Sequence, residues 1–226
     1  MVYLYLAPKW FVFYSLGLEL VFAFVTLLVA LYAYKVYRIT KEEQTRLFSL
    51  GFISISLSYL IWGILNLAAI TELNSTTTAL ELKEVSSLLS FGVFSHIVLF
   101  LLGLLIIGFN TFKIKNFRAF LLILLLGGLA VFSPGQTAKM YYVVSGLLLV
   151  FIAGHYLFEY TQRKNRGLFI MFFSFSLLFI ALFELMLSVW TTVDYVIAHM
   201  LVLASYLLIL ANLLLTLKHG KKKNKA

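Results

Sequence analysis

The chain has 226 residues, of which 62% are hydrophobic and only 12% are charged, and its mean hydropathy is +1.00. This composition excludes a disordered chain and an ordinary water-soluble globule, because both carry far more polar sequence, and with only 2 prolines the chain is not a collagen. The chain contains no cysteine, which excludes disulfides, thiolate metal sites, iron–sulfur clusters and cysteine catalysis. The composition therefore indicates an integral membrane protein.

Long apolar runs predict seven transmembrane helices. A helix needs about 20 apolar residues to cross the hydrocarbon core of a bilayer. The runs are continuous rather than alternating, which favours helices over the strands of an outer-membrane barrel. In chain order the predicted helices are 11–34, 47–70, 87–111, 118–133, 140–161, 168–190 and 194–217. They form one all-α transmembrane domain over residues 1–219, followed by a basic cytoplasmic tail at 220–226.

The positive charges predict how the chain is oriented. Loops that carry Lys and Arg near the ends of spans stay in the cytoplasm during insertion. Of the 18 Lys and Arg residues, all but Lys9, Lys83 and Lys139 fall after the first, third, fifth or seventh predicted helix. We therefore predict that the chain lies in the plasma membrane with its N-terminus outside the cell and its C-terminus in the cytoplasm. Because one membrane surface accounts for the net charge of +9, no nucleic-acid partner is expected.

The sequence also contains a candidate internal repeat. Its matching features are Phe52-Ile53-Ser54-Ile55-Ser56-Leu57 with Phe172-Phe173-Ser174-Phe175-Ser176-Leu177, His96 with His199, and Asn110 with Asn212. These matches predict that residues 11–111 and 140–217 are equivalent halves joined by helix 118–133. Equivalent helices are four spans apart, so both halves would cross the membrane in the same direction. The predicted plan is a 3+1+3 parallel repeat.

This plan resembles that of the SWEET sugar transporters and their PQ-loop relatives. The resemblance concerns the order and direction of the helices, and it implies transport without identifying a substrate. The Pro-Gln pairs that name the PQ-loop group are absent, and predicted helices 11–34 and 140–161 contain no proline. No binding residue can therefore be transferred from that group to this chain.

Two other seven-helix classes are disfavoured by particular residues. A retinal protein needs a lysine deep in its last span, whereas the last predicted span here has none before Lys218. The zinc hydrolases of the alkaline ceramidase and adiponectin-receptor group carry Ser-x-x-x-His and His-x-x-x-His patterns. Here Ser95 adjoins His96, and Leu203 stands four residues after His199, so both patterns are broken.

Polar and ionisable side chains fall at one depth in five predicted spans. An ionisable group at the centre of a span costs about 2.5 to 3.5 kcal/mol on insertion scales, so each one calls for a function or a partner. Counted inward at about 1.5 Å per residue, these side chains all lie in the outer part of the bilayer. The predicted site residues are Glu19, Trp62, Asn66, His96, Glu184 and His199. We expect them to line an outward-facing polar cavity.

Three functions are compatible with such a layer. The preferred one is binding of a small polar or ionic ligand in the cavity, with or without its transport across the membrane. The second is a metal-dependent membrane enzyme, in which Glu19, His96, Glu184 and His199 hold zinc, iron or manganese. No HExxH or ExxH motif supports it, so these ligands would have to converge through tertiary packing. The third is a sensor or assembly subunit that acts through a membrane protein partner or as a homo-oligomer.

His155 and Glu159 form a separate pair in the inner half of predicted helix 140–161. Their i, i+4 spacing places them on one helix face. Glu159 is expected either to pair with Arg163 at the membrane surface or, with His155, to form the inner end of a proton path.

Overall fold

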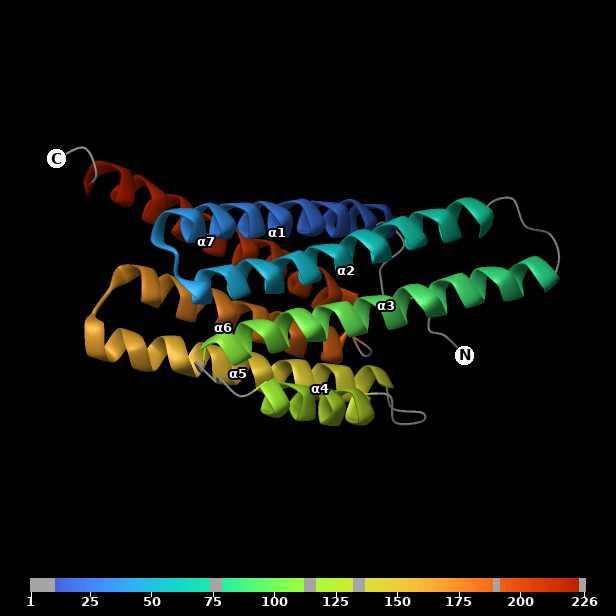
Figure 1. Ribbon diagram of the computed structural model, residues 1–226. Coiled ribbons are helices and arrows are strands. Elements are labelled where there is room, and N and C mark those ends of the chain that lie inside the picture. Colours follow the sequence, from blue (N-terminus) through green and yellow to red (C-terminus); the bar gives the residue numbers. More distant parts are fainter. Residues whose placement is uncertain (1–10, 74–78, 112–116, 132–136, 189–191, 224–226) are drawn as a thin grey trace.

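The computed structural model describes residues 11–73, 79–111, 117–131, 137–188 and 192–223. Within these ranges it contains seven α-helices and no strand, as predicted (Figure 1). The helices are α1 (Val12–Thr40), α2 (Glu43–Leu73), α3 (Ala79–Thr111), α4 (Phe117–Val131), α5 (Thr137–Arg163), α6 (Arg166–Leu187) and α7 (Thr192–Lys223).

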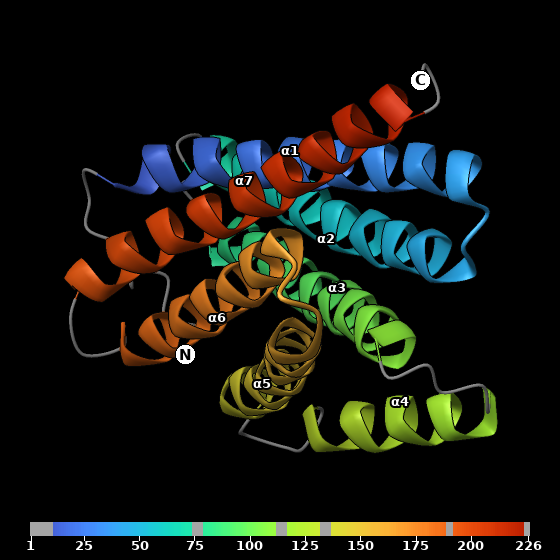
Figure 2. The ribbon, with the colours of Figure 1, turned by 90° about the vertical axis from the view of Figure 1, so that its left-hand side faces the viewer.

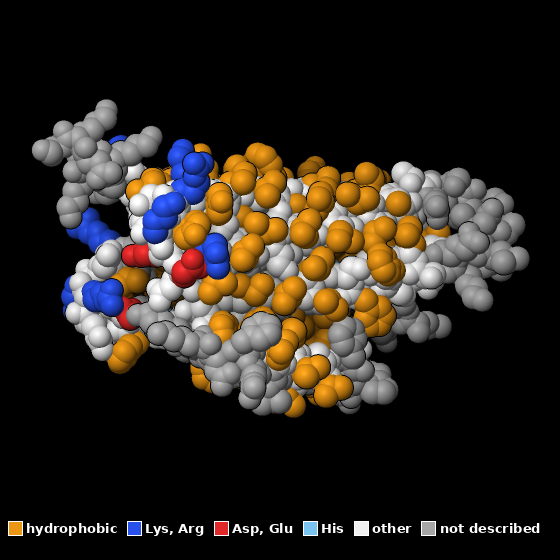
Figure 3. Space-filling view, viewed as in Figure 1, with side chains coloured by type: hydrophobic (Ala, Val, Ile, Leu, Met, Phe, Trp, Pro, Cys, Tyr) orange, Lys and Arg blue, Asp and Glu red, His pale blue; other side chains and the backbone are white. Residues whose placement is uncertain are grey.

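Six of the helices in the described ranges are long and apolar enough to cross a membrane. The exception is α4, whose 15 residues extend about 22 Å at 1.5 Å per residue, against a hydrocarbon core of about 30 Å. Large apolar side chains also cover the lateral surface, where a soluble protein would present charges (Figure 3). The chain is therefore an integral, multi-pass helical membrane protein with six candidate spans.

Six helices form a closed ring, and α4 lies outside it. Around the ring the neighbours are α1, α2, α3, α5, α6 and α7, and α7 packs back against α1. The short α4 packs on the outer side of α3 and α5, as the end-on view shows (Figure 2). Consecutive helices run in alternating directions, so α1, α3, α5 and α7 all end on the same side of the molecule (Figure 1).

We call that side the basic end. Lys and Arg side chains gather there in the space-filling view, among a few acids (Figure 3). The described residues that form it include the corners at Lys41 and Lys164, where α1 turns into α2 and α5 turns into α6. The clustering agrees with the charge pattern of the sequence, and which surface faces the cytoplasm stays a prediction.

The two corners at the basic end have the same backbone geometry. Lys41 and Lys164 are the described non-glycine residues with positive φ, at 58° and 49°. The amide of Lys41 donates to the Tyr37 carbonyl at 2.7 Å, and that of Lys164 donates to the Tyr160 carbonyl at 2.8 Å. A left-handed residue that closes this bond ends a helix and satisfies one of its last carbonyls.

Small residues allow the helices of the ring to approach closely. A Cβ atom at Gly51 would lie 2.9 Å from the Gly103 carbonyl oxygen, and one at Gly103 would lie 2.7 Å from the Gly51 carbonyl oxygen. Ser54 on α2 donates to the Leu99 carbonyl on α3 at 2.7 Å, and Ser205 on α7 donates to the Ser174 carbonyl on α6 at 2.8 Å. Small residues and serine hydroxyls therefore hold α2 close to α3 and α6 close to α7.

Candidate functional site

Glu19 forms a buried hydrogen-bonded group with two residues of α2. The indole Nε1 of Trp62 donates to one carboxylate oxygen at 2.9 Å, and the amide Nδ2 of Asn66 donates to the other at 3.0 Å. Only 5% of the Glu19 surface is exposed. Trp62 and Asn66 are one helical turn apart, so a single face of α2 supplies both donors. Three of the six predicted site residues therefore meet.

His96 is joined to this group through aromatic rings. Its ring centroid lies 6.1 Å from that of Trp62 and 5.1 Å from that of Tyr59. Its Nε2 is 3.5 Å from the Tyr141 hydroxyl on α5. Its Nδ1 is buried and makes no hydrogen bond within the described residues, although the backbone of Ser58 is nearby. A buried, unsatisfied imidazole nitrogen is uncommon and marks a polar position inside the ring of six helices.

His199 lies on the α1 and α7 side of the same layer. Its Nδ1 lies 2.8 Å from the Tyr195 carbonyl oxygen, one turn earlier in α7, and donates to it in the tautomer that this contact favours. Its ring packs on Phe22 and Phe11, at centroid distances of 5.9 and 5.7 Å. Phe22 in turn contacts Tyr59, which contacts His96. An aromatic cluster therefore separates the two histidines.

Glu184 has no bond to the other predicted site residues in the described part of the chain. It is half-buried on α6, and no hydrogen bond or ion pair there joins it to Glu19, His96 or His199. The described residues also include no group of three or more His, Cys, Asp and Glu close enough to hold a metal ion. The zinc, iron or manganese site stays an untested prediction that draws no support from this geometry.

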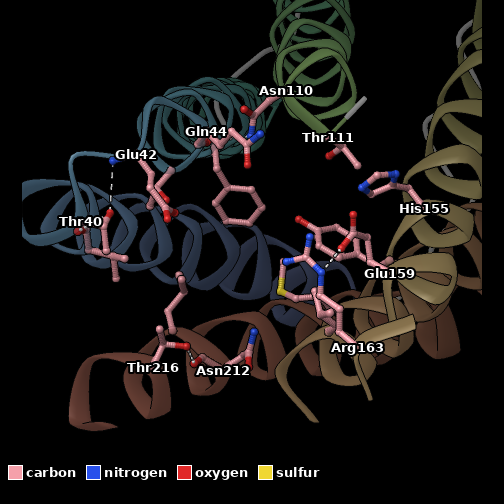
Figure 4. A pocket seen from close by; sticks show the side chains of 17 residues that line it. Thr40, Glu42, Gln44, Asn110, Thr111, His155, Glu159, Arg163, Asn212 and Thr216 are labelled. Atoms are coloured by element: carbon pink, nitrogen blue, oxygen red, sulfur yellow. Dashed lines mark hydrogen bonds and ion pairs between the residues drawn. The ribbon is translucent and has the colours of Figure 1, made fainter. Parts of the chain in front are cut away.

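A cavity of about 380 Å³ opens at the basic end of the ring (Figure 4). All six ring helices, together with the corner between α1 and α2, contribute to its wall. Its polar lining residues are Thr40, Glu42, Gln44, Thr45, Asn110, Thr111, His155, Glu159, Arg163, Asn212 and Thr216. Its volume falls at the lower end of the range for small-molecule sites, about 300 to 1,000 Å³.

The predicted pair on α5 lies in this cavity. Glu159 forms an ion pair with Arg163, with Arg163 Nε 2.9 Å from Glu159 Oε2, one of the two fates expected from the sequence. The Glu159 side chain is 18% exposed, whereas the Arg163 side chain is 65% exposed. The carboxylate therefore belongs to the wall, and the guanidinium lies at the mouth. His155 lines the same wall one turn deeper.

Two asparagines from α3 and α7 complete the polar wall. Asn110 is 9% exposed, and its Nδ2 donates to the Gln44 carbonyl at the start of α2, at 2.7 Å. Asn212 reaches the start of α6, where its Oδ1 is 3.0 Å from the position of a Cβ on Gly167. Sequence reasoning missed both as site residues. The only signal for them is their shared place near the inner ends of the predicted repeat.

No family model, curated protein or solved structure matches the chain. The fold defines the protein as a multi-pass helical membrane protein with six helices in a ring, and its function is inferred from its own geometry.

Proposed function

We propose that the protein transports a small polar or ionic solute along the axis of the six-helix ring. The observation that carries this proposal is the cavity at the basic end, to which every ring helix contributes. A cavity built by one helix pair would suit a peripheral binding site. A cavity shared by both halves instead changes whenever the halves move against each other, as alternating access requires.

The helix neighbours support two equivalent halves related by a two-fold axis through the ring. If α1, α2 and α3 correspond to α5, α6 and α7, each observed contact has an observed partner. The α1–α2 contact matches α5–α6, α2–α3 matches α6–α7, and α1–α7 matches α5–α3. The short α4 then serves as the connector that returns the chain to the side on which the second half begins (Figure 1).

Local details support the same correspondence. In both halves a left-handed lysine follows a tyrosine by four residues, and the ammonium lies near that tyrosine ring. The distances to the ring centroid are 6.0 Å for Lys41 over Tyr37 and 5.5 Å for Lys164 over Tyr160. Asn110 and Asn212 likewise approach the starts of α2 and α6.

Aromatic residues lie between the cavity and the Glu19 group. Along α2, Phe48 lines the cavity, Tyr59 follows, and Trp62 and Asn66 contact Glu19. The Tyr59 hydroxyl meets that of Tyr206 on α7 at 3.2 Å. This arrangement fits a pathway that is open at the basic end and blocked at mid-depth. The Glu19 group would then receive the solute or a coupling proton from the outer side, with the cytoplasm at the basic end.

The proposal is tested by exchange of solutes across proteoliposomes. A panel of radiolabelled amines, amino acids, organic acids and sugars is assayed for counterflow. Because the chain has no cysteine, Thr40→Cys places one thiol at the cavity wall. We expect a methanethiosulfonate reagent to block exchange by this variant.

Ile39→Cys is the matched control, because Ile39 is 54% exposed and does not line the cavity. Its exchange should persist after modification. If no member of the panel exchanges, or if modification of either thiol leaves exchange unchanged, the cavity is not part of a transport pathway. Binding without exchange would instead favour the sensor function.

A further inference from the structure

The charges around the basic end are sorted between the cavity and the outer surface. The described basic side chains there are Lys35, Arg38, Lys41, Arg46, Arg163, Lys164, Arg166 and Lys218. Of these, Arg163 alone lines the cavity. The described acids at the same end are Glu42, Glu43 and Glu159, and two of the three line it. The cavity is therefore locally acidic inside a strongly basic rim.

We propose that the cavity selects a small organic cation, with an ammonium group facing Glu159 and Glu42. This inference depends on the proposed solute site and names its ligand class. The lining of the cavity carries one positive and two negative side chains, so its net charge is negative, whereas the whole chain has a net charge of +9. The charges of Glu159 and Arg163 pair with each other, so the exposed Glu42 carboxylate gives the lining the net negative charge that an anionic solute would meet.

The position of each charge strengthens this assignment. Glu159 is 18% exposed, so water screens it less than it screens Arg163, which is 65% exposed. Charge interactions are stronger where burial lowers the local dielectric. A cation inside the cavity would thus interact with the carboxylate more strongly than it is repelled by the guanidinium at the mouth.

The remaining lining suits an alkylated ammonium. Phe48 and Tyr156 bring aromatic rings to the cavity, and Met171 contributes a polarisable thioether. Aromatic faces attract cations, most strongly in desolvated sites. Amide and hydroxyl groups from Gln44, Asn110 and Thr111 would hydrogen-bond polar substituents of the same ligand.

The two halves are unequal at this point. When the Lys41 and Lys164 corners are superposed, Glu159 and Arg163 on α5 correspond to Val36 and Thr40 on α1. Val36 and Thr40 line the opposite wall of the cavity. The ion pair of the wall therefore belongs to α5, and the second carboxylate of the lining, Glu42, lies in the corner that follows α1.

Thermal unfolding of the full chain in nanodiscs tests the inference with three probes of one shape. They are choline, its uncharged analogue in which carbon replaces the quaternary nitrogen, and dimethylbutanoate, the anion with the same branched end. A ligand that binds only the folded state raises the melting temperature as its concentration exceeds its dissociation constant. We expect the melting temperature to rise with the logarithm of the choline concentration and to rise much less with the other two probes.

Two variants locate the binding. Glu159→Gln should raise the apparent dissociation constant for choline by about tenfold, the effect of losing one charge-assisted contact. Glu43→Gln is the matched control, because Glu43 pairs with Arg46 outside the cavity and its side chain is 60% exposed. It should leave choline binding unchanged. If Glu159→Gln does not fold, Glu42→Gln replaces it, with a smaller rise expected.

Equal stabilisation by choline and its uncharged analogue, or stronger stabilisation by the anion, would overturn the cation assignment. So would equal effects of Glu159→Gln and Glu43→Gln. The outcome is separable from that of the transport proposal. Choline binding without solute exchange would leave the cation site in place and remove transport. Exchange of a neutral or anionic solute that is blocked when the Thr40→Cys thiol is modified, without any choline binding, would keep transport and remove the cation site.

Discussion

The hydroxyl groups of Tyr59 and Tyr206 lie 3.2 Å apart in the interior of the ring. Tyr59 belongs to α2 and Tyr206 to α7, two helices that do not pack against each other in the described ranges. Both rings also contact Phe22, at centroid distances of 5.3 and 6.2 Å. The bond therefore crosses the ring between the two proposed halves, where a conformational change would break it.

Removing both of these hydroxyls should destabilise the protein less than the sum of removing each one alone. Tyr206→Phe leaves the Tyr59 hydroxyl buried without its partner, which costs about 1 to 3 kcal/mol. The double variant Tyr59→Phe/Tyr206→Phe removes both polar groups and should cost less than the sum of the single variants. Unfolding free energies from a double-mutant cycle measure the coupling. Tyr34→Phe is the control, because Tyr34 is 49% exposed. Strict additivity of the two single variants would show that the bond contributes nothing.

The two hydrogen bonds that Glu19 accepts give the second prediction, which depends on how many donors and acceptors each variant leaves. Glu19→Gln keeps one acceptor oxygen for the Trp62 indole, and Asn66 can rotate its amide to accept from the new side-chain amide. Glu19→Leu removes both acceptors and leaves two buried donors unpaired, at a cost of about 1 to 3 kcal/mol for each. The leucine variant should therefore unfold at a clearly lower temperature than the glutamine variant.

Tryptophan fluorescence provides an independent measurement for the same pair of variants. Breaking the indole hydrogen bond should change the emission of Trp62 in Glu19→Leu and leave it nearly unchanged in Glu19→Gln. Trp62→Phe identifies the contribution of this residue to the spectrum. Equal melting temperatures and spectra for the two variants would contradict the hydrogen-bonded arrangement.

Close packing of α2 against α3 gives the third prediction. In Gly103→Ala the new Cβ would lie 2.6 Å from Ile55 Cγ1 and 2.7 Å from the Gly51 carbonyl oxygen, so the helix backbones must separate. Overpacking of this kind typically costs about 1 to 3 kcal/mol. Gly154→Ala is the control, because its Cβ would meet no atom within 4 Å. That change should be neutral or stabilising by up to about 1 kcal/mol from helix propensity. Similar stability of the two variants would rule out a tight α2–α3 contact.

The sequence predicted the helices well and their ends less well. Hydropathy is a local property, so seven apolar runs became seven helices in the described ranges. The observed α1 continues to Thr40 and α7 to Lys223, beyond the predicted ends at 34 and 217. Polar residues near the membrane surface lower hydropathy without breaking a helix. The fourth run is helical, but at 15 residues it falls short of the candidate spans.

The site was harder to predict, because spacing along a helix gives the depth of a residue but not the direction in which it points. Glu19, Trp62 and Asn66 share a depth and also face one another. Glu184 was placed in the same layer, yet within the described residues it makes no hydrogen bond with Glu19. The cavity at the basic end joins the ends of distant helices, and of its wall the sequence pointed only to His155 and Glu159. The predicted outward-facing cavity stays untested.

Equivalence of the two halves predicts equal responses at the two corners. Lys41 and Lys164 have φ angles of 58° and 49°, which β-branched residues adopt only with strain. Lys41→Val and Lys164→Val should each destabilise the protein by about 1 to 2 kcal/mol, whereas the glycine variants should be nearly neutral. Arg38→Val, an exposed helical position, is the control. A large effect at one corner and none at the other would argue against equivalent halves.

Orientation can be tested with the two ends of one helix, because the chain offers a background without cysteine. Lys139 and Lys164 are both exposed, the first near the start of α5 and the second just after its end at the basic end. The positive charge of the basic end predicts that Lys164→Cys faces the cytoplasm and Lys139→Cys faces outward. A membrane-impermeant maleimide applied to intact cells should therefore label Lys139→Cys at once and Lys164→Cys only after permeabilisation. The reverse pattern would place the basic cavity on the outer surface and require the proposed pathway to be reversed. Labelling of both thiols in intact cells would mean that α5 does not cross the membrane.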